Sequence, residues 1–313
     1  MSRRRKKSRI KRRRRRLNIL VGLICVVVVG AAGVMAVRMI QENSVEQTAS
    51  TNTTDATNSS EQPAKKGKAL TIETEDNADG TEAAEETDRS DFAVQPGRTV
   101  GTTEQSDEKV VYLTLDDGPS QNTQKVLDIL DKYNAKATFF VTGEMPEYKD
   151  MIKVAYDKGH TIGMHTYSHD YAKVYASVDS YFQDLDQVAQ IVKEEIGYVP
   201  CFIRFPGGSS NTISASYTKG IMSTLTKEVQ ARGYQYYDWN GSSGDGAVRT
   251  TEQLVAQATS FHDNNIILLS HDSAGKDTTV EALPRIIEYY QSQGYVFKAL
   301  DLNSYVAHHG VNN

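Results

Sequence analysis

The sequence predicts an α/β fold in which helices cover a parallel β-sheet. Three observations support this prediction: short apolar segments alternate with amphipathic helical segments, the alternation runs from about residue 109 onward, and polar residues follow the apolar segments. Strands that alternate with helices form βαβ units, whose strands pair in parallel. The pattern alone leaves two architectures open, an incomplete barrel and a doubly wound sheet.

Short apolar segments predict buried strands, and longer amphipathic segments predict helices. The predicted strands are 110–115, 137–142, 201–205, 265–270 and 295–300. The predicted helices are 120–134, 177–197 and 278–294. Each helical segment opens near a Ser or Thr that can cap a helix, and the last two end on Gly. These elements predict one domain at residues 109–313, which is long enough to bury a hydrophobic core.

The first 16 residues form a basic tail with twelve Lys or Arg residues and no acid. Residues 17–37 then contain no charged side chain, and about 20 helical residues cross the hydrocarbon core of a bilayer. We therefore predict a transmembrane signal-anchor helix at 17–38. The alternative is a cleaved signal peptide, but the apolar segment is too long for one and no Ala-x-Ala-like site ends it.

The basic tail 1–16 predicts the orientation of the chain, because Lys and Arg stay on the cytoplasmic side. The tail can also contact anionic lipid headgroups. Without its twelve cations, 23 basic residues remain against 40 acidic ones, so the exported part is acidic and nucleic acid is excluded as a partner. We expect a single-pass protein of the cell membrane with an extracellular domain, an architecture that suits a Gram-positive bacterium.

Residues 39–108 predict a disordered acidic linker that is rich in Ser and Thr and poor in aromatic residues. Such a segment repels itself and holds the domain away from the membrane. The chain has two cysteines, Cys25 in the predicted span and Cys201 in the domain, which cannot pair with each other. No disulfide framework or cysteine-based zinc site is therefore expected.

Polar residues recur after the predicted strands, where parallel α/β folds place reactive groups. Asp116 and Asp117 follow the first strand, and in isolation they are equally compatible with a helix cap or Asx turn. His165 and His169 are four residues apart, and with one carboxylate they provide three ligands for Zn²⁺ and leave one position open. His271 follows a later strand and is either a packed residue or a proton donor.

Five segments together resemble a known family, and they occur in its order and approximate spacing: TLDDGPS, HTYSH, RFPGG, SSGD and LLSHD. The sequence is similar to polysaccharide deacetylases of the NodB-homology family, carbohydrate esterase family 4. The resemblance covers residues from about 109 to 305. It implies a distorted (β/α) barrel and the metal-dependent hydrolytic removal of acetyl groups from a glycan.

The resemblance also implies a metal site and a catalytic base. Asp117, His165 and His169 match the family's ligands for one divalent metal, which we expect to be Zn²⁺, with Co²⁺ or another divalent ion as alternatives. Asp116 matches the base that takes a proton from the attacking water. Arg204 matches the arginine that pairs with this base.

The remaining motifs imply a catalytic acid and an oxyanion donor. His271 matches the general acid that protonates the leaving nitrogen, and Asp245 matches the aspartate that tunes it. Leu269 belongs to the same final motif as His271. Within RFPGG, alignment assigns the N–H of Gly207 to the oxyanion.

Two positions depart from the family's pattern. Family members commonly have Trp after the fourth-motif Asp, whereas this chain has Gly246 there and its only Trp is Trp239. The third motif is RFPGG instead of Arg-Pro-Pro-aromatic. These smaller residues predict a wider substrate groove, while the ligands and proton-transfer residues are all present.

The leading interpretation is removal of N-acetyl groups from cell-wall glycan, with GlcNAc of peptidoglycan as the expected substrate. A membrane span followed by a long spacer would bring the domain within reach of the wall. The alternative is an O-acetyl esterase that acts on xylan-like or other surface polysaccharide. A remote alternative is a catalytically dead glycan-binding protein. Such a protein would be expected to have lost a metal ligand, the base or the acid, and this sequence retains all of them.

Overall fold

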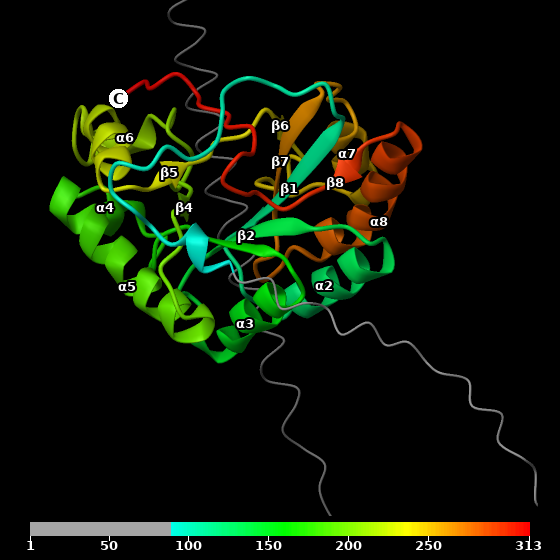
Figure 1. Ribbon diagram of the computed structural model, residues 1–313, viewed down its shortest axis with the longest axis horizontal. Helices are drawn as coiled ribbons and strands as arrows, with labels where there is room; N and C mark the ends of the chain where they lie inside the picture. Colours follow the sequence, from blue (N-terminus) through cyan, green and yellow to red (C-terminus); the bar gives the residue numbers. More distant parts are fainter. Residues whose placement is uncertain (1–88) are drawn as a thin grey trace, which may run out of the picture. The chain divides into compact units, whose positions relative to one another are not determined.

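Eight β-strands form one sheet in the computed structural model, which describes residues 89–313 (Figure 1). Each pairing between neighbouring strands is parallel, as predicted. The strands are β1 (Val110–Asp116), β2 (Ala137–Val141), β3 (Thr161–Met164), β4 (Phe202–Ile203), β5 (Gln235–Tyr236), β6 (Gly241–Ser242), β7 (Asn265–His271) and β8 (Val296–Phe297). The α-helices are α2 (Thr123–Lys132), α3 (Asp150–Asp157), α4 (Tyr171–Val174), α5 (Val178–Ile196), α6 (Ile221–Ala231), α7 (Thr251–Ala258) and α8 (Asp277–Ser292). Short 3-10 helices are η1 (Ser90–Phe92), η2 (Pro146–Tyr148) and η3 (Ile213–Ser216).

The order of the strands is β5-β4-β3-β2-β1-β7-β6, and β8 pairs with the beginning of β1. Among the described residues, the edge strands β5 and β6 do not pair with each other, so the sheet curls without closing. The predicted α/β class with a parallel sheet is therefore confirmed. The distorted barrel implied by the resemblance has the form of a curled half-barrel.

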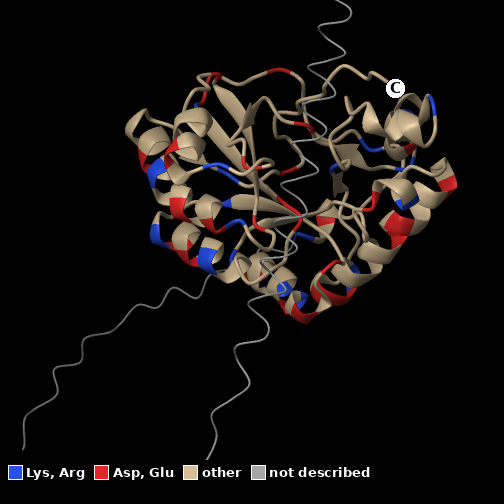
Figure 2. Cartoon of the chain, turned by 180° about the vertical axis from the view of Figure 1, so that it is seen from behind, with Lys and Arg blue, Asp and Glu red and all other residues tan. Residues whose placement is uncertain are grey.

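Apolar clusters lie on both faces of the sheet. The larger one packs alternate residues of β1, such as Leu113 and Leu115, against the outer helices, including Leu127 of α2 and Ile286 of α8. Intervening residues such as Tyr112 belong to a second cluster on the other face. Burial on both faces explains why the longest strands have nearly continuous apolar sequences. Figure 2 shows charged residues concentrated on the outer helices.

Helix α5 illustrates how well the local signals agree with the fold. Its N-cap is Ser177, whose side chain accepts a hydrogen bond from Ser180 N–H. It ends at Gly197, which has a φ of 88° and closes the helix in the left-handed region. The predicted helix 177–197 is therefore confirmed.

The segment directly before the predicted boundary at residue 109 packs against the fold. Residues 89–108, which the sequence assigns to the linker, lie against the sheet. Phe92 C=O accepts a hydrogen bond from Cys201 N–H at 2.9 Å, and Gly101 N–H donates to Leu302 C=O at 2.8 Å. The segment is acidic overall, but Phe92, Val94 and Val100 pack into the second cluster. Residues such as Phe92 and Gly101 therefore contact the folded part of the chain, and the domain boundary at residue 109 stays a prediction.

The basic tail 1–16, the predicted span 17–38 and the linker up to residue 88 lie outside the described residues. Within residues 89–313, no helix is long and apolar enough to cross a bilayer. The membrane anchor stays a prediction.

Candidate active site

The candidate site lies at the carboxyl edge of the sheet. Asp116 is the last residue of β1 and pairs in register with His271, the last residue of β7. His165 and Arg204 directly follow β3 and β4, which pair at their last residues. The parallel sheet thus brings together side chains that are far apart in the sequence, as its topology predicts.

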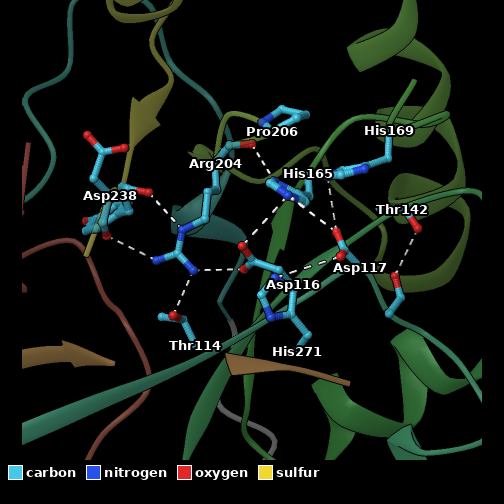
Figure 3. Close-up of polar contacts among 12 residues, drawn as sticks. Thr114, Asp116, Asp117, Thr142, His165, His169, Arg204, Pro206, Asp238 and His271 are labelled. Atoms are coloured by element: carbon cyan, nitrogen blue, oxygen red, sulfur yellow. Dashed lines mark hydrogen bonds and ion pairs between the residues drawn. The ribbon is translucent and has the colours of Figure 1, made fainter. Parts of the chain in front are cut away.

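Asp117, His165 and His169 form a cluster of possible metal ligands (Figure 3). Asp117 Oδ1 lies 3.5 Å from His165 Nε2 and 3.4 Å from His169 Nε2. The three ligand atoms all lie within 4.8 Å of one another. Asp117 Oδ1 is buried and has no hydrogen-bond partner among the described residues. A buried carboxylate oxygen without a donor is costly, so the cluster suits a bound cation.

One hydrogen bond of the His165 ring prepares it for metal binding. Its Nδ1 lies 2.8 Å from Arg204 C=O. Because a carbonyl oxygen can only accept, Nδ1 carries the proton and Nε2 presents its lone pair to Asp117. Burial lowers the pKa of His165, although Asp116 and Asp117 act in the opposite direction. The neutral imidazole, which is the form that ligates a metal, is therefore favoured.

The charge state of Asp117 also fits a cation. Burial alone would raise the pKa of this carboxyl, but the neighbouring imidazoles of His165, His169 and His271 outweigh burial and hold the pKa below its ordinary value. Two imidazoles and one carboxylate are ligands that Zn²⁺ takes, with a further position left open for catalysis. The residues present therefore fit the divalent metal that the resemblance implies.

Asp184 on α5 holds the loop that carries the two histidines. Its Oδ1 accepts hydrogen bonds from the N–H groups of Tyr167 and Ser168 at 2.6 and 3.1 Å, and its Oδ2 accepts from Ser168 Oγ at 2.6 Å. Within this loop, Thr166 and His169 have φ values of 75° and 47°, a region that non-glycine residues rarely adopt. The sequence reasoning missed Asp184, although an acid on the buried side of a predicted helix was an available signal.

Asp116 forms a buried ion pair with Arg204. Arg204 is 0 % exposed, and its Nη1 donates to Asp116 Oδ1 at 2.8 Å and to Thr114 Oγ1 at 2.7 Å. Its Nε and Nη2 donate to the backbone carbonyls of Tyr237 and Asp238. The guanidinium therefore has its charge paired and all three nitrogens bonded, which a buried charge requires. The second oxygen of Asp116, Oδ2, faces His165 Nε2 at 3.7 Å.

His271 forms a second pair, with Asp245. Asp245 Oδ1 lies 2.8 Å from His271 Nδ1, while its Oδ2 accepts from His271 N–H and from Thr279 Oγ1 at 2.8 Å each. Burial alone would lower the pKa of His271, but the hydrogen bond and charge of Asp245 raise it to about 9. The other ring nitrogen, Nε2, lies 3.9 Å from Asp117 Oδ2. His271 can therefore deliver a proton beside the metal cluster.

Gly207 and Leu269 both lie near this edge. Gly207 follows a run of buried residues, 200–206, and is itself exposed, with a φ of 73°. No hydrogen bond of its N–H to another described residue is formed. Leu269 is 8 % exposed and lies two residues before His271 on β7, so the two side chains share one face of the strand.

Gly246 occupies the position at which family members commonly have Trp. Gly246 is exposed, and a Cβ added to it would meet no atom within 4 Å. Trp239 instead packs edge-on against His309, with ring centroids 4.8 Å apart, and lies close to Gly208. The space beside Asp245 is thus open, and the wider groove stays a prediction.

Comparisons with known proteins show which family the chain resembles. The polysaccharide deacetylase family model matches residues 103–224. A peptidoglycan-N-acetylglucosamine deacetylase of Bacillus cereus is 30% identical over 202 residues, which are 61% of this chain and 69% of that protein. A bifunctional xylanase/deacetylase of Pseudobutyrivibrio xylanivorans is 33% identical over 207 residues, which are 64% of this chain and 31% of that protein.

A similar solved structure is the catalytic domain of a peptidoglycan N-acetylglucosamine deacetylase from Eubacterium rectale. It has a TM-score of 0.66 and 45% sequence identity, and the match covers 70% of this chain and all of that one. The likeness therefore extends over nearly the whole described part of the chain.

Proposed function

Since the chain belongs to the polysaccharide deacetylase family of acetyl-removing hydrolases, we propose that it removes N-acetyl groups from GlcNAc units of peptidoglycan. One observation carries the proposal. A donor set for a divalent cation, a buried carboxylate paired with Arg204, and an imidazole paired with Asp245 meet at a single edge of the sheet. Two of the similar proteins are named as deacetylases of the same substrate.

The proposed reaction depends on a divalent cation held by Asp117, His165 and His169. A cation there, Zn²⁺ in our proposal, would polarise the acetyl carbonyl and make water more acidic. The unpartnered Asp117 Oδ1 and the Nε2 lone pair of His165 support this assignment.

Asp116 is the proposed general base. Arg204 holds one carboxylate oxygen, so the other stays available on the side of His165, where the attacking water would lie. The four hydrogen bonds that Arg204 donates fix its guanidinium group and, through it, the orientation of Asp116. The proton of the attacking water passes to Asp116 Oδ2 in this arrangement.

His271 is the proposed general acid. An amide nitrogen is a poor leaving group unless it is protonated as the bond to carbon breaks. Asp245 holds Nδ1 and leaves Nε2 facing the site, so the proton leaves from Nε2. The raised pKa of His271, about 9, keeps this proton in place at neutral pH.

Gly207 and Leu269 complete the proposed acetyl pocket. The unpaired N–H of Gly207 is the proposed donor to the oxyanion that forms at the acetyl carbonyl. Leu269 provides an apolar side chain on the strand face that His271 shares, a suitable surface for the acetyl methyl group.

We also propose that the enzyme acts outside the cell from a membrane anchor at 17–38. The charge-free segment and the basic tail before it support this arrangement. Protease treatment of intact cells is expected to degrade the domain and to spare the tail. Protection of the domain would contradict the proposed orientation.

Acetate release from peptidoglycan, a chitooligosaccharide and acetylated xylan tests the proposed substrate class. We expect release from the two N-acetylated glycans, with His271→Ala lowering it at least a hundredfold. His262→Ala, which removes an exposed histidine, is the control and should have wild-type activity. Release from xylan alone, with little effect of His271→Ala, would instead identify an O-acetyl esterase, the activity class suggested by the xylanase/deacetylase relative.

A further inference from the structure

Two tyrosines at the ends of α4 contact the loop that carries Gly207. Tyr175 is 0 % exposed, and its hydroxyl donates to Pro206 C=O at 2.7 Å. Tyr171 lies with its hydroxyl over Gly207, so that a Cβ added there would overlap the phenol oxygen. The two rings pack edge-to-face, with centroids 5.5 Å apart. No assigned role in the proposed reaction accounts for either side chain.

The contact made by Tyr175 falls on a particular peptide group. Pro206 C=O and Gly207 N–H are the two ends of one planar peptide unit. A hydrogen bond to the carbonyl end therefore fixes the direction in which the N–H end points. It also polarises the peptide and strengthens the N–H as a donor. Figure 3 draws Pro206 together with the candidate metal ligands and Arg204, whose carbonyl bonds to His165.

We propose that Tyr175 is a positioning residue that aims the Gly207 N–H at the oxyanion through its hydrogen bond to Pro206 C=O. The inference rests on the proposed function, in which this N–H stabilises the oxyanion. Tyr171 acts on the other side of the same peptide. Its hydroxyl fills the space above Gly207 and prevents the loop from moving toward α4.

Tyr171 also links this loop to the metal cluster. Its ring packs edge-on against His169, with centroids 5.8 Å apart. No hydrogen bond of the Tyr171 hydroxyl to a described residue is formed. Tyr171 of α4 therefore contacts both the loop that carries Gly207 and the loop that carries His169.

Tyr175→Phe removes the hydrogen bond to Pro206 C=O and leaves the ring in place. We expect kcat for acetate release to fall about ten- to a hundredfold, because a misaimed oxyanion donor loses transition-state stabilisation. KM and the zinc dissociation constant are expected to change less than about threefold, since neither depends on the oxyanion.

Two other buried tyrosines provide matched controls. Tyr290 is 0 % exposed, and its hydroxyl donates to Ala258 C=O at 2.7 Å and to Phe261 C=O at 3.2 Å, so Tyr290→Phe loses comparable bonding away from the site. The Tyr181 hydroxyl is buried without a partner, so Tyr181→Phe loses no bond. Both variants are expected to have kcat within twofold of wild type. An equal fall in Tyr175→Phe and Tyr290→Phe would overturn the proposal, because it would indicate a general loss of packing.

The ¹⁵N chemical shift of Gly207 provides a readout that is independent of activity. This shift responds to hydrogen bonding at the preceding carbonyl, so it should change in Tyr175→Phe and stay constant in Tyr290→Phe. An unchanged shift would overturn the positioning role even if kcat fell. A wild-type protein that released no acetate from any glycan would contradict the proposed function, and with it the oxyanion role, whereas the shift would still report the contact.

Discussion

Asp245→Asn tests the proposed acid most sharply, because it alters the charge beside His271 and preserves the shape of the side chain. Asp245 Oδ2 accepts two hydrogen bonds, from His271 N–H and Thr279 Oγ1. The oxygen of the new amide is therefore expected at that position, which turns its NH₂ group toward His271 Nδ1. Both the lost charge and this donor disfavour the protonated imidazole.

The size of the effect follows from the pKa of His271. Asp245 contributes the largest interactions that raise it to about 9, and burial opposes them, so the variant should have a pKa at or below the ordinary 6.5. At pH 7.5 an imidazole with a pKa of about 9 is almost fully protonated, whereas one with a pKa of 6.5 is protonated to about one part in ten. We expect kcat to fall about tenfold or more at pH 7.5.

The pH profile of kcat is the decisive assay. In Asp245→Asn the alkaline limb should move to lower pH, and the deficit should shrink toward pH 5.5 as His271 regains its proton. Both proteins are loaded with zinc, so the charge of the cation acts on both. Asp157→Asn, which breaks only an exposed pair with Lys153, is the control and should leave the profile unchanged. An alkaline limb that does not move in Asp245→Asn would refute the assignment of His271.

Three other predictions concern the supports of the site. Arg204→Lys should lower the free energy of unfolding by about 3 kcal/mol, measured by chemical denaturation, and acetate release by at least a hundredfold, because an ammonium cannot replace all of its buried bonds. Wild-type stability together with wild-type acetate release in this variant would contradict the role of the ion pair between Arg204 and Asp116. Asp184→Ala should raise the zinc dissociation constant about ten- to a hundredfold, because the loop loses its acceptor. Asp184→Asn keeps an acceptor for the loop N–H groups and should change the constant only a few-fold. Equal constants in the wild type and both variants would exclude a supporting role. In the metal-free protein, the stability contributed by His271 should be present below pH 6.5 and lost as pH rises toward about 9, since its pKa is raised on folding; a pH-independent Tm over this range would contradict the pKa.

The long strands of the sheet could be predicted from the sequence because their composition reflects burial on two faces. Strands β1 and β7 are seven residues each, and the predicted segments 110–115 and 265–270 fall within them. Strands β3, β5 and β6 were not predicted. Strands β4 and β8 are also two residues long, but they lie within the apolar segments 201–205 and 295–300 that predicted them. A short strand has no readable periodicity, so outside such a segment its pairing depends on neighbours that only the fold supplies.

The candidate site residues could be selected from the sequence because each lies at the end of a predicted strand or belongs to a recognisable motif. Asp116, His165 and His271 lie together because parallel strands end at one edge, which the topology required. Asp184 and Tyr175 could not be identified in this way. Each acts on a loop that lies elsewhere in the sequence, through contacts that exist only after α4 and α5 pack beside the sheet. Supports of a site depend on tertiary packing, whereas its reacting groups are visible in local sequence.

The central claim, a metal-dependent deacetylase site at Asp117, His165 and His169, is tested most directly by acetate release from peptidoglycan after chelation and during zinc titration. Activity should be lost on chelation and should return in proportion to added zinc, reaching a plateau at one ion per protein. His169→Ala should bind zinc more weakly and should not regain activity at that ratio. Full activity in the chelated protein would contradict the claim. So would a protein that binds one zinc ion and still releases no acetate.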